Sequence, residues 1–411
     1  MSEVKTKVPQ LRFPGFSDEW EEKKLGNISK LTSSKRVYLD DYVQSGIPFY
    51  RGKEISELQK GLTPKDILYI SNESYEQYKS KYGIPQVDDI LITAVGTLGN
   101  ILRIKDRKPF YFKDGNLIWI KDIYEYSNFL EILLEVKNKE IQKTSIGSTQ
   151  RALTMVELRK LLLPFPAKQE QQKIAAFLTA VDTKIEQLSK KQALFSEYKK
   201  GLMQQIFSQA IRFKADDGSE FPDWEDNTID KALHSYKLGG NYSNSEAVTD
   251  YPLIKMGNLD RGNIKLNKLQ YINTEENIDD SDKINYGDLF FNTRNTLDLV
   301  GKVAIWRDEL PCAYYNSNLM KMEFSDNFFM NYRFNSFDGI KALRRVATGT
   351  TSVAAIYTKD LLKIKFSLPT LSEQQKIANF LSSIDTKIEQ AGKQLDESKQ
   401  FKKALLQQMF V

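Results

Sequence analysis

The stretch EQQKIAAFLTAVDTKIEQ at residues 170–187 returns almost unchanged as EQQKIANFLSSIDTKIEQ at residues 373–390. Compared from residue 169 and residue 372 onward, 14 of 19 positions are identical at a constant offset of 203. Self-similarity at a fixed period indicates a duplicated structural unit, and it has to be recognised before any single motif is interpreted. This repeated stretch therefore decides how the whole chain is read.

The repeat extends to both sides of that stretch. Downstream, GLMQQIF at residues 201–207 resembles ALLQQMF at residues 404–410. Upstream, LRFPGFSDEW at residues 11–20 has a partner in IRFKADDGSEFPDW at residues 211–224. The chain is thus composed of two units of roughly two hundred residues, a length typical of one or two domains each.

Between these anchors the two halves have diverged in sequence but keep one order of elements. Residues 87–106 and 285–308 each predict a strand, a turn rich in Gly, Asn or Thr, and a second strand. Residues 128–143 and 327–346 then predict helices, the second interrupted by Gly339. The Gly-rich AVGTLGN lies between strands, so it predicts a tight hairpin and not a phosphate-binding loop.

The repeated stretches predict two long helices with a heptad pattern, because apolar residues recur at alternating spacings of four and three. Prolines precede both helices and none interrupts them, and about 40 residues form a rod of roughly 60 Å. The alternative is that each helix packs on its own domain as an amphipathic core helix. The expected coiled-coil seam consists of Ile174, Leu178, Val181, Ile185, Leu188, Phe195, Leu202, Ile206, Ile377, Leu381, Ile384, Ile388, Leu395, Leu405 and Met409.

These patterns predict an α+β fold with a pseudo-two-fold internal repeat. Two mixed α/β domains alternate with two long helices, which pair as an antiparallel coiled coil. The expected segments are a first recognition domain with an N-terminal anchor at 1–165, a central helical spacer at 166–208, a second recognition domain at 209–369 and a C-terminal helical spacer at 370–411.

The composition excludes several classes of site. His234 and Cys312 are the only His and Cys, so disulfides within the chain and Cys/His zinc sites are excluded. The net charge of +5 permits contact with a polyanion without requiring it. There is no Walker phosphate loop and no apolar leader or spanning segment, so we expect a cytoplasmic binding protein without catalytic residues or a metal site.

Two variable α/β domains alternating with two near-identical helices resemble the specificity subunit of type I restriction–modification systems. The resemblance rests on PFPAKQEQQKIAAFLTAVDTKIEQ (164–187) and LPTLSEQQKIANFLSSIDTKIEQ (368–390), with GIPFYRGKEI (46–55), DILI (89–92) and GDLFF (287–291) in the domains. It covers essentially the whole chain. The first helix departs from the family's acidic start by carrying KQEQQ, and the opening of each domain is divergent.

The resemblance implies that each domain is a target recognition domain for one half of a bipartite double-stranded DNA target, with the helices setting the separation. It also implies two modification subunits, which carry S-adenosylmethionine and adenine-N6 methyltransferase chemistry, and restriction subunits with ATP and Mg. Half-sites one helical turn apart lie about 34 Å from each other, a separation that the rod can span.

Base reading requires loops that combine small polar side chains with cations for the phosphates. The candidates in the first domain are Ser33, Ser34, Lys35, Arg36, Tyr50, Arg51, Thr93, Thr97, Asn100, Ser148, Thr149, Gln150 and Arg151. Those in the second are Lys237, Asn241, Tyr242, Lys255, Asn258, Arg294, Asn295, Thr296, Arg344, Arg345, Thr350 and Thr351.

Helix residues outside the seam are identical in both copies, which suggests that each copy meets the same partner. The candidates for this partner surface are Gln171, Phe177 and Lys184 with their counterparts Gln374, Phe380 and Lys387. A different interpretation of the whole chain is a duplicated coiled-coil adaptor whose domains bind proteins or polysaccharide. A third, a nuclease around Pro222 and Asp223, lacks the further acidic and lysine residues that such a site needs.

Overall fold

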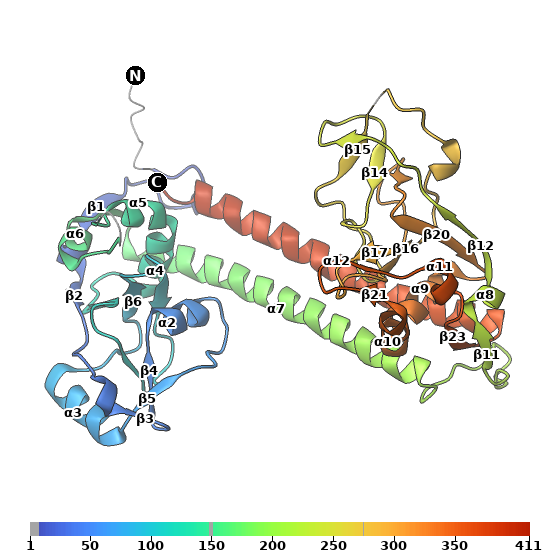
Figure 1. Cartoon of the computed structure of the whole chain (residues 1–411). Helices are drawn as coiled ribbons and strands as arrows, with labels where there is room; N and C mark the ends of the chain where they lie inside the picture. The colour runs from blue at the N-terminus through green and yellow to red at the C-terminus, as the bar shows by residue number, and fades with distance from the viewer. Residues whose placement is uncertain (1–7, 148–150, 274) are drawn as a thin grey trace. The chain divides into compact units, whose positions relative to one another are not determined.

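The computed structural model describes residues 8–147, 151–273 and 275–411. The chain divides into two compact units, a first unit of residues 1–188 with 394–411 and a second unit of residues 189–393. Each unit contains one α/β domain, called its head below, with the start of one long helix and the end of the other (Figure 1). The structure therefore has the two mixed domains and two long helices that the repeat predicts.

The head of the first unit contains two four-stranded sheets, in the orders β2-β9-β6-β7 and β3-β5-β4-β8, and a small sheet of β1 with β10. The strands are β1 (Glu21–Lys24), β2 (Lys30–Thr32), β3 (Tyr42–Val43), β4 (Ile47–Tyr50), β5 (Leu68–Ile70), β6 (Ile90–Thr93), β7 (Ile101–Arg103), β8 (Tyr111–Phe112), β9 (Leu117–Lys121) and β10 (Leu162–Phe165). The helices are α1 (Leu25–Ile28), the 3₁₀ turn η1 (Leu39–Asp41), α2 (Gly52–Gln59), α3 (Asn72–Tyr82), α4 (Ser127–Val136), α5 (Asn138–Lys143) and α6 (Met155–Lys160).

The head of the second unit repeats these sheets as β12-β20-β16-β18, β13-β15-β14-β19 and β11-β23, and adds the sheet β17-β22-β21. Its strands are β11 (Glu225–Thr228), β12 (Leu233–Leu238), β13 (Asn244–Ser245), β14 (Pro252–Ile254), β15 (Gln270–Ile272), β16 (Leu289–Asn292), β17 (Arg294–Asn295), β18 (Val303–Ile305), β19 (Tyr314–Tyr315), β20 (Leu319–Phe324), β21 (Thr348–Gly349), β22 (Ala354–Ala355) and β23 (Lys365–Leu368). Its helices are α8 (Ile229–Ala232), η2 (Asp280–Asp282), α9 (Asn327–Asn335), α10 (Phe337–Val346) and α11 (Thr358–Leu361).

The long helices are α7 (Lys168–Phe207) and α12 (Leu371–Gln408). In the first unit the start of α7 and the end of α12 share one core, which includes Ile174, Leu178 and Leu405. In the second unit the end of α7 shares a core with the start of α12. Because the start of each helix lies with the end of the other, the two pair in antiparallel fashion, as the sequence predicts.

Every residue of the expected seam is buried or half-buried. Ile174 and Leu178 also contact the core of their own head. The alternative interpretation, an amphipathic helix that packs on its own domain, therefore holds for the first turns of α7. Leu188 and Leu395 are buried although neither belongs to the core cluster of the head, as expected where helix packs on helix. The start of the helix is thus a core element of its head, and the remainder is a coiled coil.

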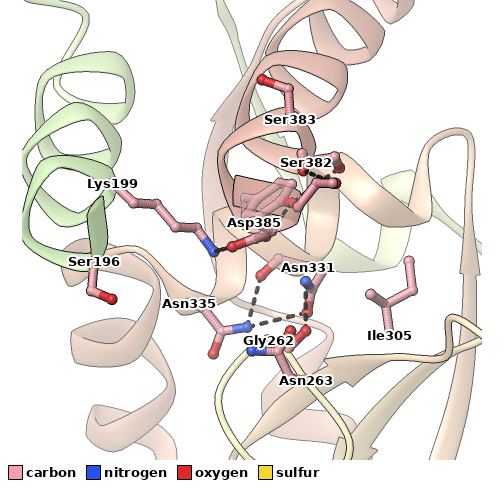
Figure 2. Close-up of polar contacts among 12 residues, drawn as sticks. Ser196, Lys199, Gly262, Asn263, Ile305, Asn331, Asn335, Ser382, Ser383 and Asp385 are labelled. Carbon is pink, nitrogen blue, oxygen red and sulfur yellow. Dashed lines mark hydrogen bonds and ion pairs between the residues drawn. The ribbon is translucent and has the colours of Figure 1, made fainter. Parts of the chain in front are cut away.

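Equivalent ion pairs join the two helices in each unit. In the second unit, Figure 2 shows the Lys199 ammonium of α7 beside the Asp385 carboxylate of α12. The Tyr332 hydroxyl donates to the same carboxylate at 2.7 Å, and burial followed by this negative charge raises the pKa of Tyr332. In the first unit Lys402 of α12 pairs with Asp182 of α7 at 2.6 Å. Each pair lies at the same place in the repeat, so the register of the coil is specified twice.

The repeated anchor segments hold the starts of the two helices. Glu170 is fully buried and accepts both hydrogen bonds of the Arg12 guanidinium at 2.6 and 2.7 Å. Glu373, equally buried, accepts from Arg212 at 2.8 Å and from the Trp224 indole at 3.1 Å. The invariance of this glutamate in both copies therefore has a structural cause beyond its favourable position in the first turn.

The spans 128–143 and 327–346 are helical as predicted, but the prediction missed the break in the first and misplaced the break in the second, which does not fall at Gly339. In the second unit the break falls at Ser336, whose side chain caps α10 by accepting from the Gly339 amide at 3.1 Å. A Cβ at Gly339 would lie 2.2 Å from the Arg333 carbonyl, so the glycine permits the close approach of the two helices. Gly339 therefore allows α9 and α10 to pack closely, and it is not the residue at which a helix ends.

Candidate nucleic-acid interface

In the second unit, two stretches predicted to contact DNA lie side by side. Strand β17, inside NTRNT (292–296), pairs with β22, and β22 pairs with β21, which follows Arg344 and Arg345. The Leu297 amide also donates to the Thr351 carbonyl at 3.2 Å. Two loops about fifty residues apart in sequence thus form one polar surface.

In the first unit the loop after β6 and the segment before α6 correspond to these two loops, and isolated backbone contacts join them. Val95 pairs with Ala152, and the Leu153 amide donates to the Ala94 carbonyl at 2.9 Å. AVGTLGN is the predicted hairpin, because β6 and β7 pair antiparallel on either side of it. Three of the predicted residues lie outside the described residues: Ser148, Thr149 and Gln150.

A solvent-open hollow lies beside this surface in the second unit. It has a volume of about 340 Å³ and is lined by Arg294, Asn318 and Tyr357 among others. The first unit has a hollow of about 410 Å³, lined by Arg36, Lys113 and Asn116 among others. Each hollow therefore combines a cation with an amide side chain, the two kinds of group that contact phosphate and base edge.

Several predicted cations are exposed and face solvent. Arg36 pairs with Asp114 at 3.2 Å but its side chain is still 69% exposed. The Arg151 guanidinium donates to the Gln142 carbonyl at 2.9 Å. The exposed candidates are Lys35, Arg36, Thr97, Arg151, Asn241, Arg294, Arg344, Arg345, Thr350 and Thr351. These residues keep the role that the sequence predicts for them as a hypothesis.

Two predicted base contacts are wrong, because their side chains are buried in their own head. Thr93 is fully buried, and its hydroxyl donates to the Thr97 carbonyl across the hairpin. Asn258 is 3% exposed, and its amide donates to the Lys265 carbonyl at 2.9 Å. Both residues fix loop conformations, which is the other common use of small polar side chains in turns.

Other predicted residues are held by partners within their own unit. Arg51 pairs with the buried Glu54 at 2.6 Å, and the Glu54 carboxylate also accepts from the Arg51 backbone amide at 2.8 Å at the start of α2. Lys237 pairs with Asp282 at 2.8 Å. The Tyr242 hydroxyl also donates to Asp282, and burial together with this carboxylate raises the pKa of Tyr242 to about 12. These interactions order the loops, so the three side chains support the surface.

The remaining candidates are half-buried. The hydroxyls of Ser33 and Ser34 donate to backbone carbonyls at 3.2 and 2.6 Å, and the Lys255 ammonium donates to Gln270 at 2.7 Å. The others in this group are Tyr50, Asn100, Asn295 and Thr296.

The predicted partner surface on the helices needs one correction. Gln171 is fully buried, and its amide donates to Glu125 at 2.9 Å and to the Pro166 carbonyl at 2.9 Å, so it is not accessible to a partner. Phe177 stacks edge-on with Phe13 of the anchor at 5.7 Å.

The counterparts of Phe177 and Gln171 in the second copy likewise contact their own unit, whereas the lysine of each copy is exposed. Phe380 packs against Phe213 at 5.4 Å, and the Gln374 amide donates to the Pro369 carbonyl at 2.8 Å. Lys184 and Lys387 are exposed. Identity in the two copies therefore reflects packing of the anchor at most of these positions.

Two further pairs were missed by sequence reasoning. Tyr198 and Phe401, which are 57% and 54% exposed, are aromatic residues at the repeat offset of 203 outside the seam. That offset would have identified them. Asn116 and Asn318 line the two hollows, but a one-residue difference in loop length hides their equivalence in the sequence.

Neither a metal centre nor a membrane span is found in the described part of the chain. Within residues 8–147, 151–273 and 275–411, no three His, Cys, Asp or Glu side chains gather as a metal site would require. In the same residues no helix is long and apolar enough to cross a membrane. What the described surface offers is a set of cationic and amide groups for binding.

The sequence matches a family model described as the type I restriction modification DNA specificity domain, over residues 17–194 and 235–397. Two similar proteins come from Methanocaldococcus jannaschii. The putative type I restriction enzyme MjaX specificity subunit is 26% identical over 95% of this chain and 92% of its own length. The type I restriction enzyme MjaVIII specificity subunit is 24% identical over 96% of this chain and 92% of its own length.

Solved structures share the fold. The type I restriction–modification S subunit from M. genitalium superposes with a TM-score of 0.63 at 14% identity, covering 98% of this chain and 99% of that one. A chain from a structure titled for complex assembly and conformational transition of the type I R-M system gives a TM-score of 0.51 at 15% identity, covering 96% and 98%.

Proposed function

The chain belongs to the type I restriction–modification DNA specificity family, and on that premise we propose that each head reads one half of a bipartite DNA target. The paired helices would set the separation of the half-sites and dock two modification subunits, so that recognition directs adenine-N6 methylation and restriction. Methyl transfer from S-adenosylmethionine would take place on the modification subunits, and ATP- and Mg-dependent steps on the restriction subunits. This chain would supply recognition.

One observation carries this proposal: both heads keep the same strand order in three corresponding sheets while the residues around their hollows differ. A shared scaffold with different surface side chains is the arrangement expected of two readers for two different sequences. Exposed cations beside each hollow can hold the phosphates, and such electrostatic contacts supply most of the affinity of a protein for DNA.

The test is a selection from random duplex DNA by the chain assembled with its modification subunits, followed by a salt titration on the selected DNA. The expected result is an enriched pair of short sequences at a fixed distance. The logarithm of the binding constant should fall linearly with the logarithm of the salt concentration, with a slope near −0.9 per neutralised phosphate. Without enrichment and without salt dependence, the adaptor that binds protein or polysaccharide would be the better account.

Two matched variants separate the heads. Arg294→Ala should weaken selection in one half-site only, and Arg36→Ala in the other, because each arginine lines the hollow of one unit. Equal loss in both half-sites from either variant would contradict one reader per half-site.

A further inference from the structure

The two asparagines that line the hollows occupy equivalent positions in the two heads. Asn116 and Asn318 each stand directly before the equivalent inner strand, β9 or β20. The backbone carbonyl of Asn116 accepts from the Ala94 amide at 2.7 Å. That of Asn318 accepts from the Thr293 amide at 3.3 Å. The same turn thus places one asparagine beside the loop pair of each head.

The surroundings of these two residues have diverged. The turn is KDGN in the first unit (113–116) and NSN in the second (316–318), so its length differs by one residue. The cations that share the hollow are Arg36 and Lys113 in the first unit and Arg294 in the second, and the two arginines come from unrelated positions. The asparagine is nevertheless present in both.

No structural role accounts for either asparagine. Asparagine is often needed where the backbone has a positive φ, but neither residue is among the described residues with that conformation. Among the described residues, neither side-chain amide has a hydrogen-bond partner; the bonds of both residues are made by backbone atoms. Both side chains are half-buried and open to the hollow.

A free carboxamide offers a donor and an acceptor side by side. In the major groove, adenine is the base that presents an acceptor at N7 next to a donor at N6, so asparagine can bind it with two hydrogen bonds. We propose that Asn116 and Asn318 are specificity-determining residues, each reading an adenine edge in one half of the target. This inference rests on the proposed function and assigns the base-reading atoms within it.

The exposed arginine in each hollow then has a separate task. It neutralises phosphate and positions the amide, and it does not distinguish bases. Loss of the asparagine should therefore change the preferred base at one position, whereas loss of the arginine should weaken selection evenly at all positions of that half-site.

The experiment is a selection from random duplex DNA with the assembled complex, comparing the original chain with Asn318→Leu and Asn318→Asp. Leucine keeps the side-chain volume without polar atoms. We expect the preference for adenine at one position of one half-site to fall about tenfold or more. Aspartate, which only accepts, should move the preference at that position toward cytosine, whose N4 group is a donor.

Asn116→Leu is the matched control, because it should give the same loss at one position of the other half-site only. Thermal unfolding of both variants should match that of the original chain, since no intramolecular hydrogen bond is removed. The inference is overturned if Asn318→Leu keeps the full preference, if all positions weaken uniformly, or if both half-sites change together. If the original complex enriches no sequence, the proposed function fails and this inference fails with it.

Discussion

Buried charge at the start of each long helix makes single side chains decisive for the fold. Glu170 and Glu373 sit in the first turn, fully buried, and each receives a guanidinium from an anchor segment. Removing one partner of a buried ion pair leaves the other charge without compensation. The anchor therefore depends on this one residue in each unit.

Replacing Glu373 by glutamine should destabilise the second unit by about 3 kcal/mol. The substitution removes the buried countercharge of Arg212, which keeps only the exposed Asp223 at 3.4 Å, and it weakens the acceptor of the Trp224 indole. Amide hydrogen exchange of strand β16, compared with that of β6 in the first unit, measures the loss locally. Glu389→Gln, at an exposed position of the same helix, should leave exchange in both strands unchanged. Equal protection in the two variants would contradict this role.

The sequence indicates which kinds of residue the proposed DNA surface would use, but not which of those side chains are accessible. Thr93 and Arg36 both belong to polar stretches of the sequence, yet Thr93 ends β6 and is fully buried, and Arg36 has a side chain 69% exposed. The difference lies in tertiary packing, because Thr93 is covered where β6 pairs with β9 at Leu117, and no local pattern encodes that burial. Asn116 and Asn318 were missed because their equivalence appears only when the strands are superposed.

The long helices are the elements that the sequence predicts best. Their period, their preceding prolines and their first-turn glutamates are local signals, and the observed helices contain every residue of the predicted heptad pattern except Met409, which directly follows α12. The break between α9 and α10 was misplaced, since it depends on a side-chain cap at Ser336 and on packing at Gly339. Helix boundaries that are fixed by such contacts cannot be predicted from the helix propensities of the residues.

Reversing the charge of Lys199 should weaken the pairing of the helices. Its ammonium lies beside Asp385, and both side chains are about four-fifths buried, at 18% and 20% exposure. Lys199→Glu places two like charges together and should cost about 1–2 kcal/mol, measured as faster amide exchange in the adjacent turns of α7 and α12. Lys200→Glu, at the neighbouring exposed position, is the control and should change exchange little.

The exposed aromatic pair on the helices should take part in docking the modification subunits. Exposed aromatic residues repeated on two copies of one helix provide two similar apolar contacts. Tyr198→Lys or Phe401→Lys alone should reduce the number of bound modification subunits from two to one, and both together should abolish assembly. Analytical ultracentrifugation of the reconstituted complex measures the number of bound modification subunits. Unchanged stoichiometry in the double variant would place the docking surface elsewhere.

Within the first unit, the two ends of the chain complete one head. The Leu11 amide donates to the Gln408 carbonyl at 2.9 Å, and Phe410 stacks on Phe129 at 5.6 Å beside Trp20. In the second unit the end of α7 supplies the equivalent Phe207, which contacts Phe329 at 5.9 Å. Each head is thus completed by the end of the helix that does not start from it.

Truncating Phe410 to alanine should therefore destabilise the first head although the residue is next to the end of the sequence. Removing the buried ring would leave a cavity that costs about 3–4 kcal/mol of stability. Amide hydrogen exchange in β6 should therefore accelerate, while exchange in β16 should not change. Phe401→Ala, on the exposed face of α12, should leave exchange in both strands unchanged while weakening partner docking. Identical exchange in Phe410→Ala and in the original chain would contradict completion of the head by this end.

The central claim, one half-site read by each head, is tested most directly by mapping methylated adenines in genomic DNA of a host that carries this chain with its modification subunits. The account predicts one motif of two short specified sequences separated by a fixed run of unspecified bases. It also predicts that Asn318→Leu alters one of these sequences and leaves the other and the gap intact. A continuous motif, or simultaneous change of both halves by this substitution, would contradict it.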